Sequence, residues 1–243
     1  MYLEEQAFRF PTGRFVGDAC GVFSRNFLPL FAAYLVVSLV LNFASCLGLF
    51  LTGPFAAGMA WMSLRAVCGE AVRFEDVFKL FSRFMPTMIL GLVQYGIVLA
   101  GFVVFGLPTL AGIAWAMAEN NVVALFAVFF VGGTLTLLPL VYVLFYFTPG
   151  WFFILDDRVD WYEALVKSHA LVKRQRAAWL GFLVPVSLLH LAITLTCIGA
   201  LVATPWIFLC FALAFLHQTA AEARGEGGPG GPPPVPGVSA PSP

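Results

Sequence analysis

Charged residues are scarce in this sequence and are missing from most of its length. Only 11% of the 243 residues are charged, and four long stretches carry no charge at all. These uncharged stretches are 26–64, 84–118, 120–155 and 177–221. The hydrophobic fraction of 60% also lies outside the composition of ordinary soluble domains. The scarcity of charge therefore excludes a soluble globular protein and indicates a chain built for a lipid bilayer.

Catalytic and metal-binding motifs are missing as well. The sequence has no GxSxG, HExxH or Walker motif, and no GxGxxG that follows a predicted strand. Its five cysteines are scattered singly, which argues against a disulfide framework and a zinc site. A net charge of zero offers no footprint for nucleic acid. We expect no enzyme activity, cofactor, metal or nucleic-acid partner.

Two of the uncharged stretches are long enough for helical hairpins. A spanning helix needs about 20 apolar residues, so 26–64 and 177–221 each have room for two crossings. We predict the turn of the first hairpin from Leu47 to Pro54 and that of the second from Cys197 to Pro205, where glycine and proline gather.

The middle of the chain predicts two further crossings. Residues 86–107 would cross once and 122–147 would return, with 119–121 as the outer loop and 108–118 as a short continuation in the outer leaflet. All thirteen Lys and Arg residues then lie on one side. Because cationic loops stay in the cytoplasm, this segregation predicts a multi-pass protein of the bacterial inner membrane with both termini inside. The predicted fold is an all-α transmembrane bundle of about six crossings.

The sequence divides into three parts. Residues 1–22 form a predicted cytoplasmic segment without the pattern of a signal peptide, and 23–221 form the transmembrane domain. Residues 222–243 are rich in glycine and proline and are predicted to be disordered. This tail is either a solvated extension or a polyproline ligand for an aromatic groove.

An internal repeat runs through the apolar part. Residues 54–61 read PFAAGMAW and 108–115 read PTLAGIAW, with five of eight positions identical. A Phe-Ser-Arg triplet precedes Pro29 and another precedes Pro86, and a fainter third copy includes Pro185. Glycines in these motifs let helices approach closely in lipid. Repeated membrane units are weak evidence for transport.

Two amphipathic segments are predicted to be helices on the cytoplasmic face. In 74–84, phenylalanines recur at three- and four-residue spacing and charged residues occupy the opposite side. In 160–173, Asp160 is placed to cap a helix, and Glu163 and Lys167 form an i,i+4 pair.

Three polar residues fall within the predicted crossings at similar depth: Asn42, Gln94 and His190. Polar groups in hydrocarbon are costly and are often functional. We hypothesise that the three meet in the bundle interior as a small polar site that holds a proton or a substrate headgroup. The alternative is that each side chain only forms a hydrogen bond between helices and has no further function.

A cationic cluster precedes the fifth predicted crossing. Lys173, Arg174 and Arg176 are candidate contacts for anionic lipid headgroups, and they also anchor the cytoplasmic end of that crossing.

Residues 139–173 carry a resemblance to a known family. Pro139 begins an apolar run that ends in Ile-Leu-Asp-Asp at 154–157, and Glu-Ala-Leu-Val-Lys-Ser follows at 163–168. This pattern resembles a broad group of bacterial six-helix membrane proteins that includes the membrane domain of some glycerophosphoryl diester phosphodiesterases. The resemblance implies a helical membrane module and, at Asp157, Glu163 and Ser168, a candidate cytoplasmic surface. The phosphodiesterase domain itself is not present in this chain, so its activity is not implied.

Three functions compete for this sequence. The first is a non-catalytic scaffold that meets a protein partner on its cytoplasmic face. The second is a transporter or lipid-handling protein that uses the bundle interior. The third is an intramembrane enzyme, which no nucleophile–base pair supports.

Overall fold

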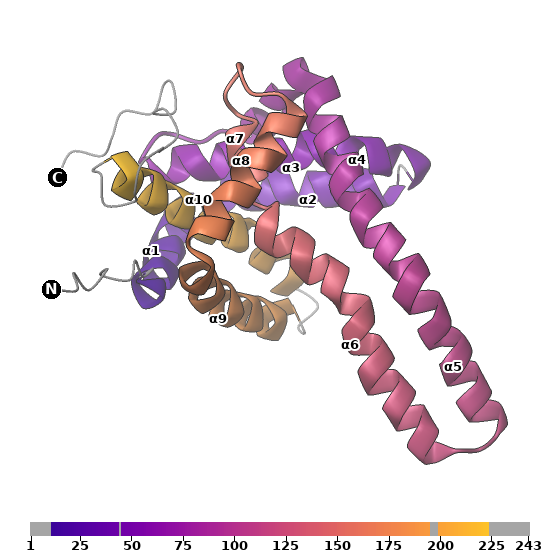
Figure 1. Ribbon diagram of the computed structural model, residues 1–243. Coiled ribbons are helices and arrows are strands. Elements are labelled where there is room, and N and C mark those ends of the chain that lie inside the picture. Colours follow the sequence, from indigo (N-terminus) through magenta and orange to yellow (C-terminus); the bar gives the residue numbers. More distant parts are fainter. Residues whose placement is uncertain (1–10, 44, 195–198, 224–243) are drawn as a thin grey trace, which may run out of the picture.

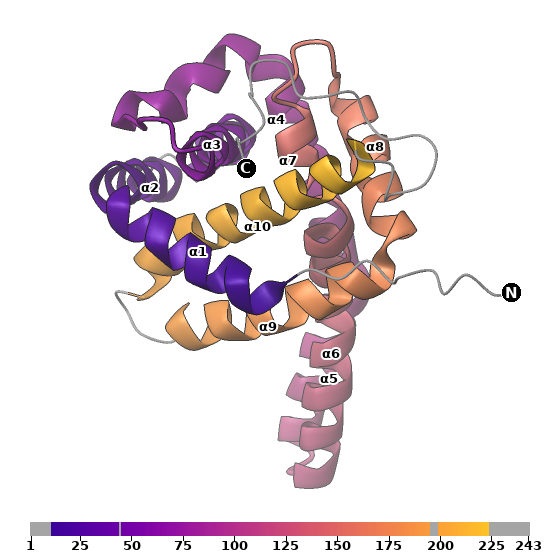
Figure 2. The same ribbon diagram turned by 90° about the vertical axis from the view of Figure 1, so that its left-hand side faces the viewer.

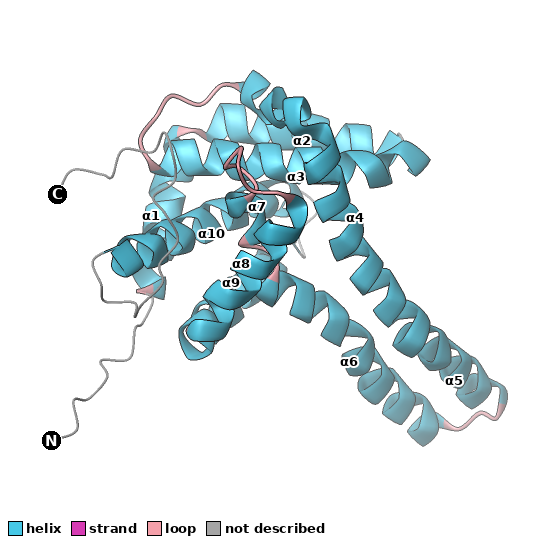
Figure 3. Ribbon diagram, turned by 45° about the horizontal axis from the view of Figure 1, so that its top comes forward, coloured by secondary structure: helices cyan, strands magenta, loops and turns pink. Residues whose placement is uncertain are grey.

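The computed structural model describes residues 11–43, 45–194 and 199–223, and in these ranges the chain is helical almost throughout, with no strand (Figures 1 and 3). The first half contains α1 (Thr12–Arg25), α2 (Phe27–Phe43), α3 (Ser45–Val67), the 3₁₀ helix η1 (Phe74–Arg83), α4 (Phe84–Gly101), the π-helical turn η2 (Phe102–Gly106) and α5 (Leu107–Ala118). The second half contains α6 (Val122–Tyr146), α7 (Gly150–Phe153), α8 (Trp161–Arg174), α9 (Arg176–Thr194) and α10 (Gly199–Ala223). The predicted all-helical class is confirmed. The predicted boundary at 22/23 falls inside α1, and most of the predicted tail lies outside the described residues.

Three helical pairs make up the apolar part of the molecule and leave its centre in different directions. The pairs are α2 with α3, α4–η2–α5 with α6, and α9 with α10, and the members of each pair pack on one another. In Figure 1 the α2–α3 pair and the α4–α6 pair diverge, and Figure 2 shows α9 and α10 running across the molecule below α2 and α3, which are seen end-on. Helix α3 is central, since it packs against α2, α4, η1, α7 and α10.

The first predicted hairpin turn is wrong, and so is the part of the second that lies in the described residues. Gly53 and Pro54 lie inside α3, and Pro205 lies inside α10. Helix α2 instead ends at Phe43 and α3 begins at Ser45, while Cys197 lies outside the described residues. In a uniformly apolar helix, proline is tolerated because neighbouring helices compensate for its missing N–H, so it does not mark the turn.

The longest rod of the fold is formed by α4, η2 and α5, which follow one another without interruption. Their 18, 5 and 12 residues reach roughly 52 Å at 1.5 Å per residue. The predicted turn at 119–121 is confirmed: Asn120 adopts φ 53°, a left-handed conformation that asparagine tolerates. The side chain of Asn121 caps α6 by accepting a hydrogen bond from Ala124 N at 3.0 Å.

Each amphipathic element covers a helical pair other than the one it precedes. Helix α1 packs on α10, η1 packs on α3, and α8 packs on α7, α4 and α6. The predicted surface helix at 74–84 is therefore helical, but Val77 and Leu80 are buried against the rest of the molecule. In α8 the predicted pair is confirmed, with Lys167 Nζ 2.9 Å from Glu163 Oε1, and Asp160 is the N-cap.

Close helix approach depends on two glycines of α3. A Cβ atom on Gly53 would lie 2.1 Å from the carbonyl oxygen of Thr87 in α4, and one on Gly58 would lie 2.0 Å from that of Val77 in η1. These contacts confirm the predicted packing role of the small residues.

The length and apolar character of several helices fit membrane spans. Among the described residues, four helical segments are long and apolar enough to cross a bilayer. A fifth is added if α1 and α2, which meet at an angle of 88°, count as one broken span. The six crossings of the predicted topology stay a prediction.

Candidate functional site

The segment from the end of α6 to the start of α8 is held by side chains from two other places in the chain. Pro149 ends the helical run, so the last carbonyls of α6 have no partner in their own helix. Gln94 Nε2 donates a hydrogen bond to the carbonyl oxygen of Phe147 at 3.2 Å, and Ser168 Oγ donates to that of Tyr146 at 2.6 Å. Ser168 therefore substitutes for a missing backbone donor, while Gln94 adds a second donor to a carbonyl that also accepts from Gly150 N at 3.0 Å.

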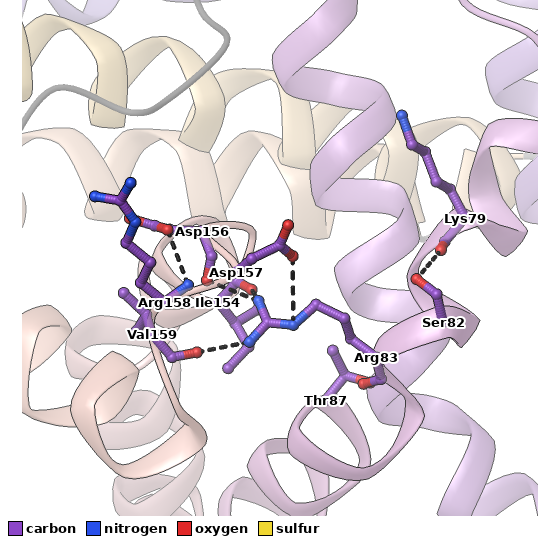
Figure 4. Close-up of polar contacts among 9 residues, drawn as sticks. All are labelled: Lys79, Ser82, Arg83, Thr87, Ile154, Asp156, Asp157, Arg158 and Val159. Atoms are coloured by element: carbon purple, nitrogen blue, oxygen red, sulfur yellow. Dashed lines mark hydrogen bonds and ion pairs between the residues drawn. The ribbon is translucent and has the colours of Figure 1, made fainter.

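Arg83 holds the loop that follows α7 (Figure 4). Its Nη1 donates to the carbonyl oxygens of Ile154 and, at 2.7 Å, of Asp156. Its Nη2 donates to the carbonyl oxygen of Val159 at 2.8 Å, and its Nε lies 3.7 Å from Asp157 Oδ1. We call Arg83 and the loop 154–159 the arginine clamp.

The chemistry of the arginine clamp is structural. The guanidinium is a fixed fork of five donors, and here it reaches three carbonyl oxygens and one carboxylate. The Arg83 side chain is only 17% exposed, so little of it remains for a ligand, while Asp157 is 90% exposed. The clamp ties the start of α4 to the segment that follows α6. We call this end of the longest helical pair its base, and the end at the turn 119–121 its tip.

A second buried node joins the last three helices. Gln218 in α10 is fully buried, accepts a hydrogen bond from Trp179 Nε1 at 2.8 Å, and donates to the carbonyl oxygen of Leu171 at 3.2 Å. Around it the core is aromatic: Trp179, Phe182 and Phe211 are in mutual ring contact. The side chain of Gln218 thus orients α8, α9 and α10 without lining an open space.

The three predicted intramembrane polar residues do not form one site. Asn42 is exposed on α2 and donates to the carbonyl oxygen of Ser38 in its own helix at 2.7 Å. Gln94 is buried on α4 at the base described above. His190 is partly buried on α9, and its Nδ1 has no hydrogen-bond partner in the described part of the chain. Within that part, α2, α4 and α9 are not packed against one another as pairs, so the predicted meeting point is not assembled.

The predicted surface residues separate into two groups. Lys173 and Arg174 end α8 and Arg176 begins α9, and all three are exposed. Asp157 and Glu163 are exposed too, but Ser168 is fully buried, so its assignment to the cytoplasmic surface is wrong. The physical reason is that Ser168 Oγ supplies a donor for the end of α6, which draws this face of α8 into the core.

Charged residues also fasten the turn between α3 and η1. Arg65 Nε lies 2.7 Å from Glu70 Oε2, and Arg65 Nη1 lies 3.0 Å from Asp76 Oδ2. The hydrogen bond to Glu70 raises the pKa of Arg65, and the charges of Asp76 and Glu70 add to this against the effect of burial. Burial raises the pKa of the Cys68 thiol in the same turn, and the negative charge of Glu70 adds to that rise.

Sequence reasoning missed the roles of Arg83 and Gln218. Arg83 is one of the charged residues of the amphipathic segment 74–84, and its position directly before an uncharged stretch of 35 residues marks it as the last cation before the membrane. Gln218 lies inside another uncharged stretch, near its end, where a polar side chain needs a hydrogen-bond partner. Both positions were visible in the sequence, but their backbone acceptors were not.

An apolar groove lies on the longest helical pair. Its volume is ≈ 440 Å³, and residues of η2, α5 and α6 line it. The threonines in its wall are bonded within their own helices: Thr109 Oγ1 donates to Phe105 and Thr134 Oγ1 donates to Phe130. In the described ranges no cluster of three His, Cys, Asp or Glu side chains is arranged to hold a metal ion.

Comparison with known proteins gives no match: no family model, curated protein or solved structure is similar enough to the chain to assign it to a family. The family resemblance of residues 139–173 therefore stays a prediction.

Proposed function

We propose that the protein is a non-catalytic scaffold of a bacterial inner membrane. The observation that carries this proposal is the filling of its interior. Phe152 stacks on Phe215 with ring centroids 5.2 Å apart, and Phe153 meets the same ring edge-on at 5.1 Å. The buried polar side chains donate hydrogen bonds to backbone carbonyls, as in Gln94, Ser168 and Gln218. A substrate site needs a concave space with convergent polar groups, and this packing favours a structural role instead.

Aromatic residues support a placement of the longest helical pair in the membrane. Tyr95 and Tyr142 are 50% and 42% exposed near its base, and Trp115 is 56% exposed near its tip. Twenty residues separate Tyr95 from Trp115, which corresponds to roughly 30 Å of helix, the thickness of the hydrocarbon core. Tyr and Trp concentrate at the two interfaces of a bilayer. On this spacing, the proposed crossing is 95–115 in place of the predicted 86–107. The revised crossing includes most of α5.

The proposed orientation has the base of this pair in the cytoplasm. The arginine clamp and the exposed Lys173, Arg174 and Arg176 all belong to the base, whereas the tip carries only Glu119 as a charged residue. The cationic cluster would contact anionic lipid headgroups. The exposed carboxylates of Asp157 and Glu163 would face a cytoplasmic protein partner of this scaffold.

The packing of the amphipathic elements supports three repeated units. The units are α1–α2–α3, η1–α4–η2–α5–α6 and α8–α9–α10, each an amphipathic segment followed by a helical pair. Each amphipathic segment packs on the preceding unit in cyclic order, with α1 on α10, η1 on α3 and α8 on α4 and α6. We infer a triplicated module, in agreement with the six-helix family that residues 139–173 resemble.

Water access to the interior tests the scaffold against a transporter. Leu209 in α10 is fully buried, so Leu209→Cys in a cysteine-free background should resist a membrane-impermeant thiosulfonate reagent from either side of the membrane. The matched control is Glu119→Cys, an exposed position that should react from one side. Rapid labelling of Leu209→Cys at a rate comparable to the control would overturn the scaffold proposal.

Lipid handling is the second candidate, and the apolar groove favours it. Gly133 lines the groove, and a Cβ atom added there would meet nothing within 4 Å. Gly133→Leu should therefore fill the groove without disturbing the helices. Gly96→Leu is the matched control, because Gly96 also faces open space but lies outside the groove lining. Native mass spectrometry from lipid particles would favour lipid handling if a stoichiometric lipid is lost in Gly133→Leu alone.

A further inference from the structure

Both helices of the longest pair are irregular at the same level. Residues Phe102–Gly106 form a π-helical turn between α4 and α5, and Pro139 interrupts α6. The two irregularities touch, because a Cβ atom on Gly101 would lie only 2.0 Å from Cγ of Pro139. Only a glycine at 101 permits this approach.

Each irregularity makes its helix easier to bend. A π turn replaces the i→i+4 pattern with i→i+5 bonds and holds one residue more than an α turn. Pro139 has no N–H to donate to the carbonyl of Leu135, four residues earlier in α6. Sharp bends in helices occur at such π turns and prolines. A bend at this level therefore costs less in both helices than a bend elsewhere in the pair.

The parts of the pair on either side of the two irregularities differ in how they pack against the rest of the molecule. On the base side, α4 packs against α3, and the end of α6 is held by Gln94 and Ser168. On the tip side, the close packing of α5 in the described chain is with α6 and η2. The tip is nevertheless tight within itself, since Gly112 faces Val128 and Gly132 faces Thr109 at contact distance.

We propose that residues 101–106 together with Pro139 form a hinge inside the membrane, about which 107–138 moves as one rigid unit. The apolar groove borders this hinge, because its lining includes Phe102, Gly106 and Leu137. Because most of the groove lining belongs to 107–138, the groove moves with this unit, and movement at the hinge changes the angle of the pair to its neighbours. The inference is independent of the scaffold proposal, since it concerns the mechanics of the chain and not what the chain binds.

Pulsed electron paramagnetic resonance tests the hinge in the full chain in lipid nanodiscs. Spin labels at Glu119→Cys and Glu163→Cys, in a cysteine-free background, report the distance between tip and base. The wild-type hinge should give a broad distance distribution. Pro139→Ala restores a donor for Leu135, and deletion of Val104 converts the π turn into an α turn. Each change should narrow the distribution, and both together should narrow it most.

Two controls make the result decisive. Leu138→Ala changes an exposed apolar residue beside Pro139 and should leave the distribution broad. Labels at Glu75→Cys in η1 and Glu163→Cys in α8 lie on exposed positions outside the moving unit, and their distribution should stay narrow in every variant. The hinge is refuted if the wild-type tip distribution is as narrow as that of the base pair, or if neither change narrows it. Should the deletion variant fail to fold, Pro139→Ala alone decides.

Discussion

Single side chains at the base of the longest helical pair donate hydrogen bonds to backbone carbonyls of helix ends and of the loop 154–159. Arg83 is the strongest case, because one guanidinium satisfies the carbonyls of Ile154, Asp156 and Val159. A lysine keeps the charge but lacks the planar fork. Individual residues here determine how helix ends and loops are completed.

Replacing Arg83 should destabilise the fold even when its charge is kept. Arg83→Lys leaves carbonyl oxygens of the loop without donors, and we expect a loss of about 2–3 kcal/mol in the free energy of unfolding. Denaturation in detergent micelles, followed by tryptophan fluorescence, measures this loss. Arg158→Lys is the matched control, because the Arg158 side chain is exposed, and Asp157→Asn should cost less than about 1 kcal/mol as a solvent-exposed ion pair. Wild-type stability in Arg83→Lys would contradict a stabilising role of the arginine clamp.

The Cys68 thiol should react slowly with iodoacetamide at neutral pH. Burial, with the charge of Glu70, raises the pKa of Cys68, so the reactive thiolate is scarcer than in a free cysteine. The alkylation rate at this peptide, followed by mass spectrometry, should keep rising at pH values where free N-acetylcysteine has already levelled off. Glu70→Gln removes the smaller of the two causes, the negative charge. It should lower the pH midpoint of the alkylation rate, but only part of the way to that of N-acetylcysteine. A midpoint equal to that of N-acetylcysteine would contradict the prediction.

Helix contacts are the next larger scale, and here the approach of α3 to α4 depends on Gly53. Gly53→Ala would place a methyl group 2.1 Å from the carbonyl oxygen of Thr87, so the helices must separate. We expect a loss of about 1–3 kcal/mol, the usual cost of overpacking. Gly96→Ala, where the added methyl group meets nothing within 4 Å, should be neutral or slightly stabilising. Equal melting temperatures of the two variants in detergent would show that α3 and α4 do not depend on this contact.

The whole molecule is organised by the segregation of its charges, which predicts the side of the membrane that each loop occupies. In intact cells and a cysteine-free background, Glu119→Cys should react with a membrane-impermeant maleimide. Glu163→Cys should react only after the membrane is permeabilised, because it belongs to the cationic base. The reverse labelling pattern would invert the proposed topology.

Much of the helical content could be predicted from the sequence, because uncharged stretches of this length have to be helical in a membrane. The turn at 119–121 was predictable as well, since Glu119, Asn120 and Asn121 interrupt the apolar run. The end of α2 at Phe43 was not, because its surroundings are uniformly apolar. The clustering of Asn42, Gln94 and His190 failed for a related reason: similar depth along separate helices does not determine which helices pack together.

The amino-acid sequence by itself determined that this chain is helical and apolar in long segments, and where its cations lie along it. These properties follow from local composition, since each helix satisfies its backbone within its own segment. Only the tertiary structure decided that the three helical pairs diverge, that Ser168 is buried, and that Arg83 reaches carbonyls more than seventy residues away. The physical reason is that backbone carbonyls have no sequence signature, so their partners are determined by how the helix ends pack.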